Sequence, residues 1–327
     1  MEISYTAPDF VQSVINRLGR TEDLRFSPSN KRLAVSEFSN NRIALFDIEI
    51  ILSNGNKVVS LKNVMEIASD KLNHPHGLDF IDENNIVIAN RDASVIIFQI
   101  PVNNSGKLFE LRPLEIFGEF EHVNTPGSVA VLGPSKNPFE LFVCNNYSNT
   151  VTRHLIELNN GFSVRKNHVL LTRWMDIPDG ISLSANGRWM AISNHSTHCV
   201  LLYKDVHALD ASAEPDGFLG CVRYPHGLRF CSGDNAILVA DAGSPFVHVY
   251  VAGPDEWVGV RTPRFSLKAI TDEEFLSGRH NPQEGGPKGI DVTRDMSLLV
   301  TTNECRPLAF FDLQAVLQQA SHASLQG

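Results

Sequence analysis

A segment that recurs six times constrains the fold of this chain more than any other feature. Each copy contains a turn, an apolar strand, a second turn and a second strand that closes on Asn, Asp or Glu. The copies start near residues 22, 76, 127, 179, 226 and 288, so the spacings are 54, 51, 52, 47 and 62 residues. A strand-rich period near fifty residues is typical of β-propellers. We therefore predict an all-β, six-bladed β-propeller that occupies residues 1–327 as one domain.

Each copy can be divided into four strands, as residues 77–81, 86–90, 94–100 and 107–117 show in the second copy. The sixth copy offers only three strands before a helix-like tail at residues 314–320. We expect the ring to be closed by an N-terminal strand, for which the apolar residues 10–18 are suited, because closure removes both exposed edges. Residues 204–214 look helical, and the charged segment 265–286 could cover one face as a lid.

Composition narrows the range of partners. A net charge of -9 without a stripe of Lys and Arg argues against nucleic acid. No apolar run has the length of a membrane span, and no signal peptide is visible at the N-terminus. The five cysteines are scattered, which disfavours a disulfide framework or a zinc knuckle. We therefore expect a cytoplasmic protein that binds a small-molecule substrate, with no nucleic acid or membrane partner; the oligomeric state stays open.

Antiparallel pairing brings the start of each first strand and the end of each second strand to the same edge, at one mouth of the channel. Two sets of six residues should meet there. The inner set is Glu22, His76, Gly127, Asp179, His226 and Lys288. The second set is Glu37, Asn90, Asn145, Asn194, Asp241 and Asn303. A structural role for the second set is as well supported as a functional one, because Asn and Asp side chains commonly form hydrogen bonds with the following turn.

The inner set has the chemistry of a metal site. Carboxylate and amide oxygens suit calcium, whereas imidazoles favour a transition metal. The alternative is a water-filled channel whose lining residues bond one another, although several buried charges without an ion are costly. Lys288 could bind an anionic substrate or neutralise the carboxylates.

Short motifs carry a family resemblance. The sequence HPHGL at residues 74–78, with DENN at 82–85, resembles the second blade of the paraoxonases, and EDL at 22–24 resembles their first calcium-binding segment. PDGIS at 178–182 is similar to a blade of the wider superfamily that includes gluconolactonases and senescence marker protein, diisopropylfluorophosphatase and strictosidine synthase-like proteins. The resemblance implies a catalytic calcium held by Glu22 and Asp179, with His76 in the place of a proposed general base. Gly127 and His226 depart from the family pattern, which opens the site to zinc, iron or manganese.

These observations favour a metal-dependent hydrolase of a small ester, lactone or phosphotriester. The expected metal ligands are Glu22, Asp179 and His226, with Asn145 and Asn194 as helpers. His76 would act as base or fourth ligand, so the expected catalytic pair is His76 and Asp179. Alternatives are a metal-dependent lyase or isomerase, a non-enzymatic propeller that binds a peptide or protein, and a metal-free condensing enzyme that uses Glu304.

Overall fold

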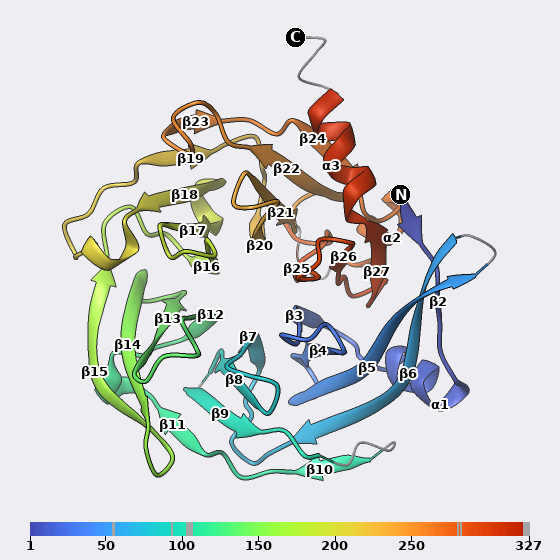
Figure 1. Cartoon of the computed structure of the whole chain (residues 1–327), viewed down its shortest axis with the longest axis horizontal. Helices are drawn as coiled ribbons and strands as arrows, with labels where there is room; N and C mark the ends of the chain where they lie inside the picture. The colour runs from blue at the N-terminus through green and yellow to red at the C-terminus, as the bar shows by residue number, and fades with distance from the viewer. Residues whose placement is uncertain (54–55, 93, 103–106, 280, 282, 323–327) are drawn as a thin grey trace.

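The computed structural model describes residues 1–53, 56–92, 94–102, 107–279, 281 and 283–322. Within these residues the chain forms six sheets arranged around a central axis (Figure 1). Each sheet is one blade built on four antiparallel strands. The predicted all-β, six-bladed β-propeller is therefore confirmed.

In each of the first three blades the strands follow one another from the central axis outward, which is also their order in the chain. Blade one holds β3 (Thr21–Phe26), β4 (Arg32–Glu37), β5 (Arg42–Ser53) and β6 (Asn56–Ala68). The short strands β2 (Tyr5–Thr6) and β10 (Leu108–Glu110) both pair in parallel with β6. Blade two holds β7 (Pro75–Phe80), β8 (Asn85–Asn90), β9 (Val95–Gln99) and β11 (Glu115–Phe117). Blade three holds β12 (Pro126–Leu132), β13 (Phe139–Asn145), β14 (Thr150–Leu158) and β15 (Phe162–Leu171).

The next two blades repeat this plan, and short helical turns connect some of the strands. Blade four holds β16 (Pro178–Leu183), β17 (Trp189–Asn194), β18 (Cys199–Lys204) and β19 (Gly217–Leu219), to which β23 (Gly259–Arg261) adds in parallel. Blade five holds β20 (Pro225–Cys231), β21 (Ala236–Asp241), β22 (Phe246–Val251) and β24 (Phe265–Lys268). The single-turn 3₁₀ helices are η1 (Glu119–Glu121), η2 (His195–Thr197) and η3 (Val206–Ala208).

The N-terminal strand closes the ring, but it is not the segment predicted. Blade six holds β25 (Ile290–Val292), β26 (Leu298–Thr301) and β27 (Ala309–Asp312), and β1 (Glu2–Ile3) pairs antiparallel with β27. Figure 1 shows the N-terminus beside this last blade. Residues 10–18 instead contribute to helix α1 (Asp9–Ile15), whose apolar residues repeat at helical spacing and bury Val11, Val14 and Ile15.

The hydrophobic core lies between the blades. Each of six clusters of buried apolar residues joins strands of two neighbouring blades. The aromatic residues of the third strands are almost fully buried in these layers: Phe46, Phe98, Tyr203, Tyr250 and Phe310. The blades therefore form a rigid ring that fixes the position of the inner strands.

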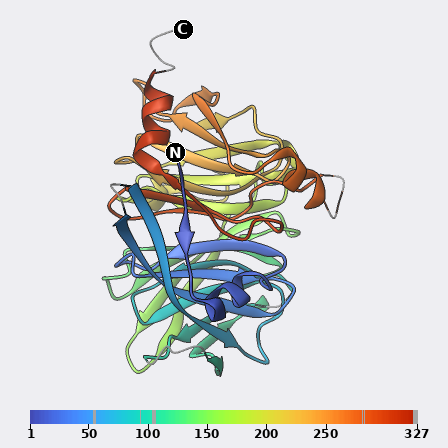
Figure 2. The ribbon, with the colours of Figure 1, turned by 90° about the vertical axis from the view of Figure 1, so that its right-hand side faces the viewer.

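The remaining helical predictions had mixed outcomes. The tail forms α3 (Leu313–His322), as expected. Residues 204–214 begin with the last residue of β18 and otherwise hold only η3, so the helix predicted there is wrong; Asp205 has a left-handed φ of 53°, which interrupts a helix. In the segment 265–286, α2 (Asp272–Ser277) projects from one flat side of the ring (Figure 2), and residues 280 and 282 lie outside the described residues. None of the helices in the described part of the chain has the length and apolar character that a membrane span requires.

Candidate active site

β-Bulges aim the inner set into the channel. In blades one to five the pairing register between the first and second strands shifts near the start of the first strand, for example between Pro75 and Leu78. The residues in or at these bulges are Glu22, His76, Gly127, Asp179 and His226. A bulge bends its strand and re-aims a side chain. The repeated bulge therefore gives five equivalent positions around one axis.

Glycine follows four of the six inner residues, His76, Asp179, His226 and Lys288, and packing explains it. A Cβ on Gly77 would lie 2.5 Å from Ser128 Cα, and one on Gly180 would lie 2.2 Å from the carbonyl oxygen of His226. Both distances are far below van der Waals contact. The inner strand of the following blade passes so closely that only glycine fits.

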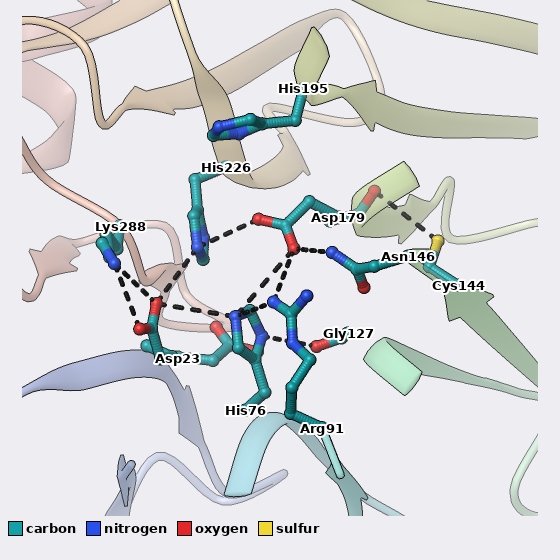
Figure 3. Close-up of polar contacts among 12 residues, drawn as sticks. Asp23, His76, Arg91, Gly127, Cys144, Asn146, Asp179, His195, His226 and Lys288 are labelled. Atoms are coloured by element: carbon teal, nitrogen blue, oxygen red, sulfur yellow. Dashed lines mark hydrogen bonds and ion pairs between the residues drawn. The ribbon is translucent and has the colours of Figure 1, made fainter. Parts of the chain in front are cut away.

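Four side chains of the inner set meet at the floor of the mouth. Glu22 Oε2 lies 3.2 Å from His226 Nε2 and 3.6 Å from His76 Nε2. Asp179 Oδ2 lies 3.0 Å from His226 Nε2, and Asp179 Oδ1 lies 3.9 Å from His76 Nε2. All four side chains are buried, and Figure 3 shows His76, Asp179 and His226 pointing toward one another. The structure thus brings together the four residues on which the predicted site depends.

Three permanent cations surround this floor. Lys288 Nζ lies 3.0 Å from Glu22 Oε2 and 2.9 Å from Glu284 Oε2. Arg20 Nε donates to Glu22 Oε1. Arg91 Nη2 contacts His76 Nε2 and lies 3.2 Å from Asp179 Oδ1 (Figure 3). Each buried carboxylate is therefore matched by at least one cation.

These contacts set the protonation states. Burial disfavours ionisation of Glu22 and Asp179, but the cations outweigh it and hold the pKa of both carboxyls well below the usual range. Lys288 is the largest cationic influence on Glu22, and His226 is the largest on Asp179. Burial, assisted by Arg91, lowers the pKa of His76 to about 3. Burial also opposes the charge of His226, yet Asp179 and Glu22 raise its pKa to about 9. At neutral pH His76 is therefore neutral and His226 is protonated.

Asn146 takes the place that the third blade leaves empty. Gly127 carries no side chain, and a Cβ built there would lie 1.7 Å from Asn146 Oδ1. Asn146 is fully buried, and its Nδ2 donates to Asp179 Oδ1 (Figure 3). Gly127 is thus the exception in the inner set because a neighbouring strand end supplies the polar group.

A pocket opens above the floor. Its volume is about 760 Å³, which is within the range of small-molecule sites. Five histidines line it: His74, His76, His195, His198 and His226. His195 Nε2 lies 3.4 Å from Glu284 Oε1, and Figure 3 shows the His195 ring above His226. Glu304 instead lines a smaller neighbouring pocket of about 270 Å³, which also contains Arg20.

The second set holds loops in place. Asn145 Oδ1 accepts from the backbone N–H of Asn124, and Asn194 Oδ1 accepts from that of Asp176. Asn90, Asp241 and Asn303 also bond backbone groups of the segments that lead into their own blades. The structure therefore places the two predicted helper ligands, Asn145 and Asn194, at the ends of β13 and β17, where local hydrogen bonds occupy their amides.

The sequence prediction missed the residues that follow the second set. Arg91, Asn146 and His195 each come one position after Asn90, Asn145 and Asn194, and all three line the pocket. The repeat itself carries the signal, since the strand turns away after its last paired residue and exposes the next side chain to the mouth. The missing side chain at Gly127 is a second signal, because it leaves room for Asn146.

The donor set fits a divalent transition metal. Glu22, His76 and His226 offer donor atoms that lie within 4.8 Å of one another, as ligands of one ion do when each bond is about 2 Å. His76 Nδ1 lies 2.7 Å from the carbonyl oxygen of Gly127; this oxygen only accepts, so Nδ1 carries the proton and Nε2 has the lone pair, which accepts from Arg91 in this structure and would bind an ion in its place. Two imidazoles beside carboxylates favour zinc, iron or manganese over calcium. An ion would displace Arg91 from His76 and the proton from His226.

Comparisons with known proteins identify no family for this chain. No family model matches the sequence. The chain is 28% identical over 130 residues to adenosine deaminase RL5 from an unknown prokaryotic organism, a match that covers 38% of this chain and 50% of that protein. The chain thus spans about half the length of the curated relative it matches. A solved structure of a candidate 6-phosphogluconolactonase from Bacteroides uniformis ATCC 8492 has a TM-score of 0.49 and 13% identity, and covers 72% of this chain and 67% of that one. The molecule is a six-bladed β-propeller, and the superfamily suggested by its motifs stays a prediction.

Proposed function

We propose that the protein is a metal-dependent hydrolase that acts on a small ester, lactone or phosphotriester at the mouth of the channel. The observation that carries this proposal is the convergence of Glu22, His76 and His226 at the floor of the pocket, with donor atoms within 4.8 Å of one another. The hydrogen bond from His76 Nδ1 to Gly127 supports it, since metal-binding histidines commonly use their second nitrogen in this way.

In this proposal Glu22, His76 and His226 hold the ion, and Asp179 lies beside it. A bound divalent ion would polarise a carbonyl or phosphoryl oxygen and lower the pKa of a coordinated water. Asp179 stays ionised and accepts a hydrogen bond from the attacking water at a carboxylate oxygen. His76 is a ligand rather than the base, because a pKa of about 3 makes its imidazole a weak proton acceptor and a carbonyl engages its other nitrogen.

The cationic side chains of Lys288 and Arg91 have a second role in the same proposal. Lys288 and Arg91 contact the two carboxylates from the pocket side. Their N–H groups are positioned to donate to a substrate oxygen that gains negative charge during hydrolysis. The same arrangement would serve a lyase or isomerase that stabilises an enolate.

One observation favours a non-enzymatic binding propeller as the second candidate. The floor is already balanced by ion pairs, because protonated His226 lies between Glu22 and Asp179 and Lys288 pairs with Glu22. Such a network satisfies buried charges without an ion. Under this candidate the pocket recognises a ligand, or the side chain of a peptide or protein partner, and performs no chemistry.

Metal analysis of the purified protein separates the two candidates. We expect about one equivalent of zinc, iron or manganese per chain, a lower melting temperature after chelation, and hydrolysis of at least one lactone, ester or phosphotriester that chelation abolishes. Glu22→Gln and His226→Gln should lose the metal, whereas His207→Gln, an exposed histidine on the outer surface, should retain it. Protein that binds no added metal and is unaffected by chelator would refute the hydrolase and leave the binding propeller.

A further inference from the structure

Two arginines present unused hydrogen-bond donors to the pocket. A guanidinium has five N–H donors. Within the described residues, the hydrogen bonds of Arg20 use Nε alone, so its two terminal amino groups are unused. Those of Arg91 use Nη2, and its buried Nε has no partner among the described residues. Native proteins seldom leave buried donors without partners. The buried Nε of Arg91 therefore indicates that a ligand with acceptor atoms binds beside it, and the partly exposed terminal amino groups of Arg20 are open to the same ligand.

Aromatic rings fix the direction of both side chains. The Arg20 guanidinium carbon lies 4.3 Å from the centre of the Phe38 ring. That of Arg91 lies 5.6 Å from the centre of the Tyr147 ring. Contact between a guanidinium and an aromatic face holds the planar fork in place without using its N–H groups. The two terminal amino groups of Arg20 therefore form a free edge for a ligand that binds in two-point fashion, as carboxylates and phosphates do, whereas Arg91 can add single hydrogen bonds from the groups other than Nη2.

The charges of the site are arranged in two levels. The carboxylates of Glu22 and Asp179 lie at the buried floor and are paired there with His226 and Lys288. The side chain of Arg20 is 38% exposed, so it reaches the open part of the pocket. A ligand that enters therefore meets Arg20 before it meets Glu22 and Asp179. The other acids of the pocket lining, Asp92 and Glu284, are themselves paired, with His74 and with Lys288 and His195. This is notable in a chain whose net charge is -9, since the overall charge would repel an anion.

We propose that the pocket binds a small organic anion, and that Arg20 and Arg91 recognise its carboxylate or phosphate group. To call this anion a substrate depends on the proposed hydrolase, but the binding itself does not. The anionic group lies against the wall formed by Arg20, Phe38, Arg91 and Tyr147. The uncharged part of the molecule then extends toward Glu22, His76 and His226. Asn146 Oδ1, which is buried and has no partner among the described residues, accepts a hydrogen bond from a hydroxyl group of the ligand.

Titration calorimetry with three probes tests the proposal. Glycerol 3-phosphate, glycerate and glycerol share a carbon skeleton and carry a phosphate, a carboxylate and no charge. We expect the better of the two anions to bind at least about tenfold more tightly than glycerol, and its affinity to fall as salt is added. Which anion binds better identifies the group as a phosphate or a carboxylate. Equal affinities for the three probes, or no binding of either anion, would overturn the proposal.

Variants assign the binding to the two arginines. Arg20→Met and Arg91→Met should each lower the affinity for the anion that binds more tightly by about tenfold or more. Both variants should leave the affinity for glycerol unchanged. Arg165→Gln is the matched control, because Arg165 is exposed on an outer strand and pairs with Glu157. Melting temperatures show that each variant is folded, and Arg20 is the safer test because its side chain is partly exposed. Equal loss of affinity in Arg165→Gln would contradict the assignment.

The measurement separates this proposal from the hydrolase. Binding is recorded without turnover, both on protein as purified and after chelation. Anion binding that persists after chelation supports the arginine wall whatever the outcome for the hydrolase, which is rejected only if the protein also binds no added metal and hydrolyses none of the esters. Metal-dependent hydrolysis of neutral lactones alone, without affinity for either anion, would support the hydrolase and reject anion binding by the arginines.

Discussion

Replacing Gly127 with alanine tests whether Asn146 occupies the place of a missing inner side chain. The new Cβ would lie 1.7 Å from Asn146 Oδ1, so the amide must move. Asn146 is fully buried and donates to Asp179, and a hydrogen bond to a charged group contributes roughly 1.5–3 kcal/mol. Overpacking adds roughly 1–3 kcal/mol. We expect Gly127→Ala to lower the free energy of unfolding by about 3 kcal/mol.

Urea unfolding of four proteins isolates the cause: wild type, Gly127→Ala, Asn146→Ala and the double variant. Asn146→Ala removes the group that clashes, so alanine at position 127 should cost little in that background. The double variant should match Asn146→Ala within about 0.5 kcal/mol, which is the usual error of additivity. Losses that add in the double variant would refute the reasoning, because the cost of the alanine would then come from somewhere other than the Asn146 amide.

Three further predictions concern the ring. Burial raises the pKa of Glu37 to about 7 from 4.5, so the folded state holds this proton more tightly; the contribution is present below pH 4.5 and is lost as the pH rises to 7. Glu37→Gln should therefore match the wild type near pH 4.5 and exceed its stability above pH 7 by up to about 3 kcal/mol in urea unfolding, and an unchanged pH profile would contradict this. Ile3→Ala should cost roughly 2–4 kcal/mol, because Ile3 packs in the closing blade, whereas the exposed Ile51→Ala should cost under about 0.5 kcal/mol; equal losses would show that β1 does not close the ring. Asp291→Ala should cost roughly 3–5 kcal/mol in thermal or urea unfolding, since it leaves buried Arg229, 3.0 Å away, without its close partner, and a neutral result would show that the pair is not structural.

Much of the fold was predictable because the repeat fixes it. The inner residues recur at the same point of each copy, and a closed ring of equivalent blades has to bring them to one axis. Glu22, His76, Asp179 and His226 were therefore predicted as neighbours from spacing alone. The closing strand was harder, because β1 is only two residues long and its pairing with β27 depends on the whole ring. Residues 10–18 are apolar, but their spacing is that of a helix.

The details of the site could be predicted only in part. Position in the copy identifies strand ends, yet it does not say which of two successive residues faces the pocket. Asn145 and Asn194 therefore were predicted as ligands, while Asn146 and His195 were missed. The amide of Asn146, just after β13, fills the space above Gly127 in the neighbouring strand β12. A sequence pattern contains no information on such a contact between strands. Cationic contacts such as Arg91 with Asp179 likewise depend on rotamers set by the assembled channel.

Anomalous diffraction from crystals soaked in Mn²⁺ or Zn²⁺ is the most direct measurement. The proposed hydrolase predicts one strong peak on the channel axis, about 2.0–2.3 Å from Glu22, His76 and His226, with Arg91 displaced from His76. Density that shows no ion at this position, with Arg91 still in contact with His76 and Lys288 with Glu22, would contradict the metal centre.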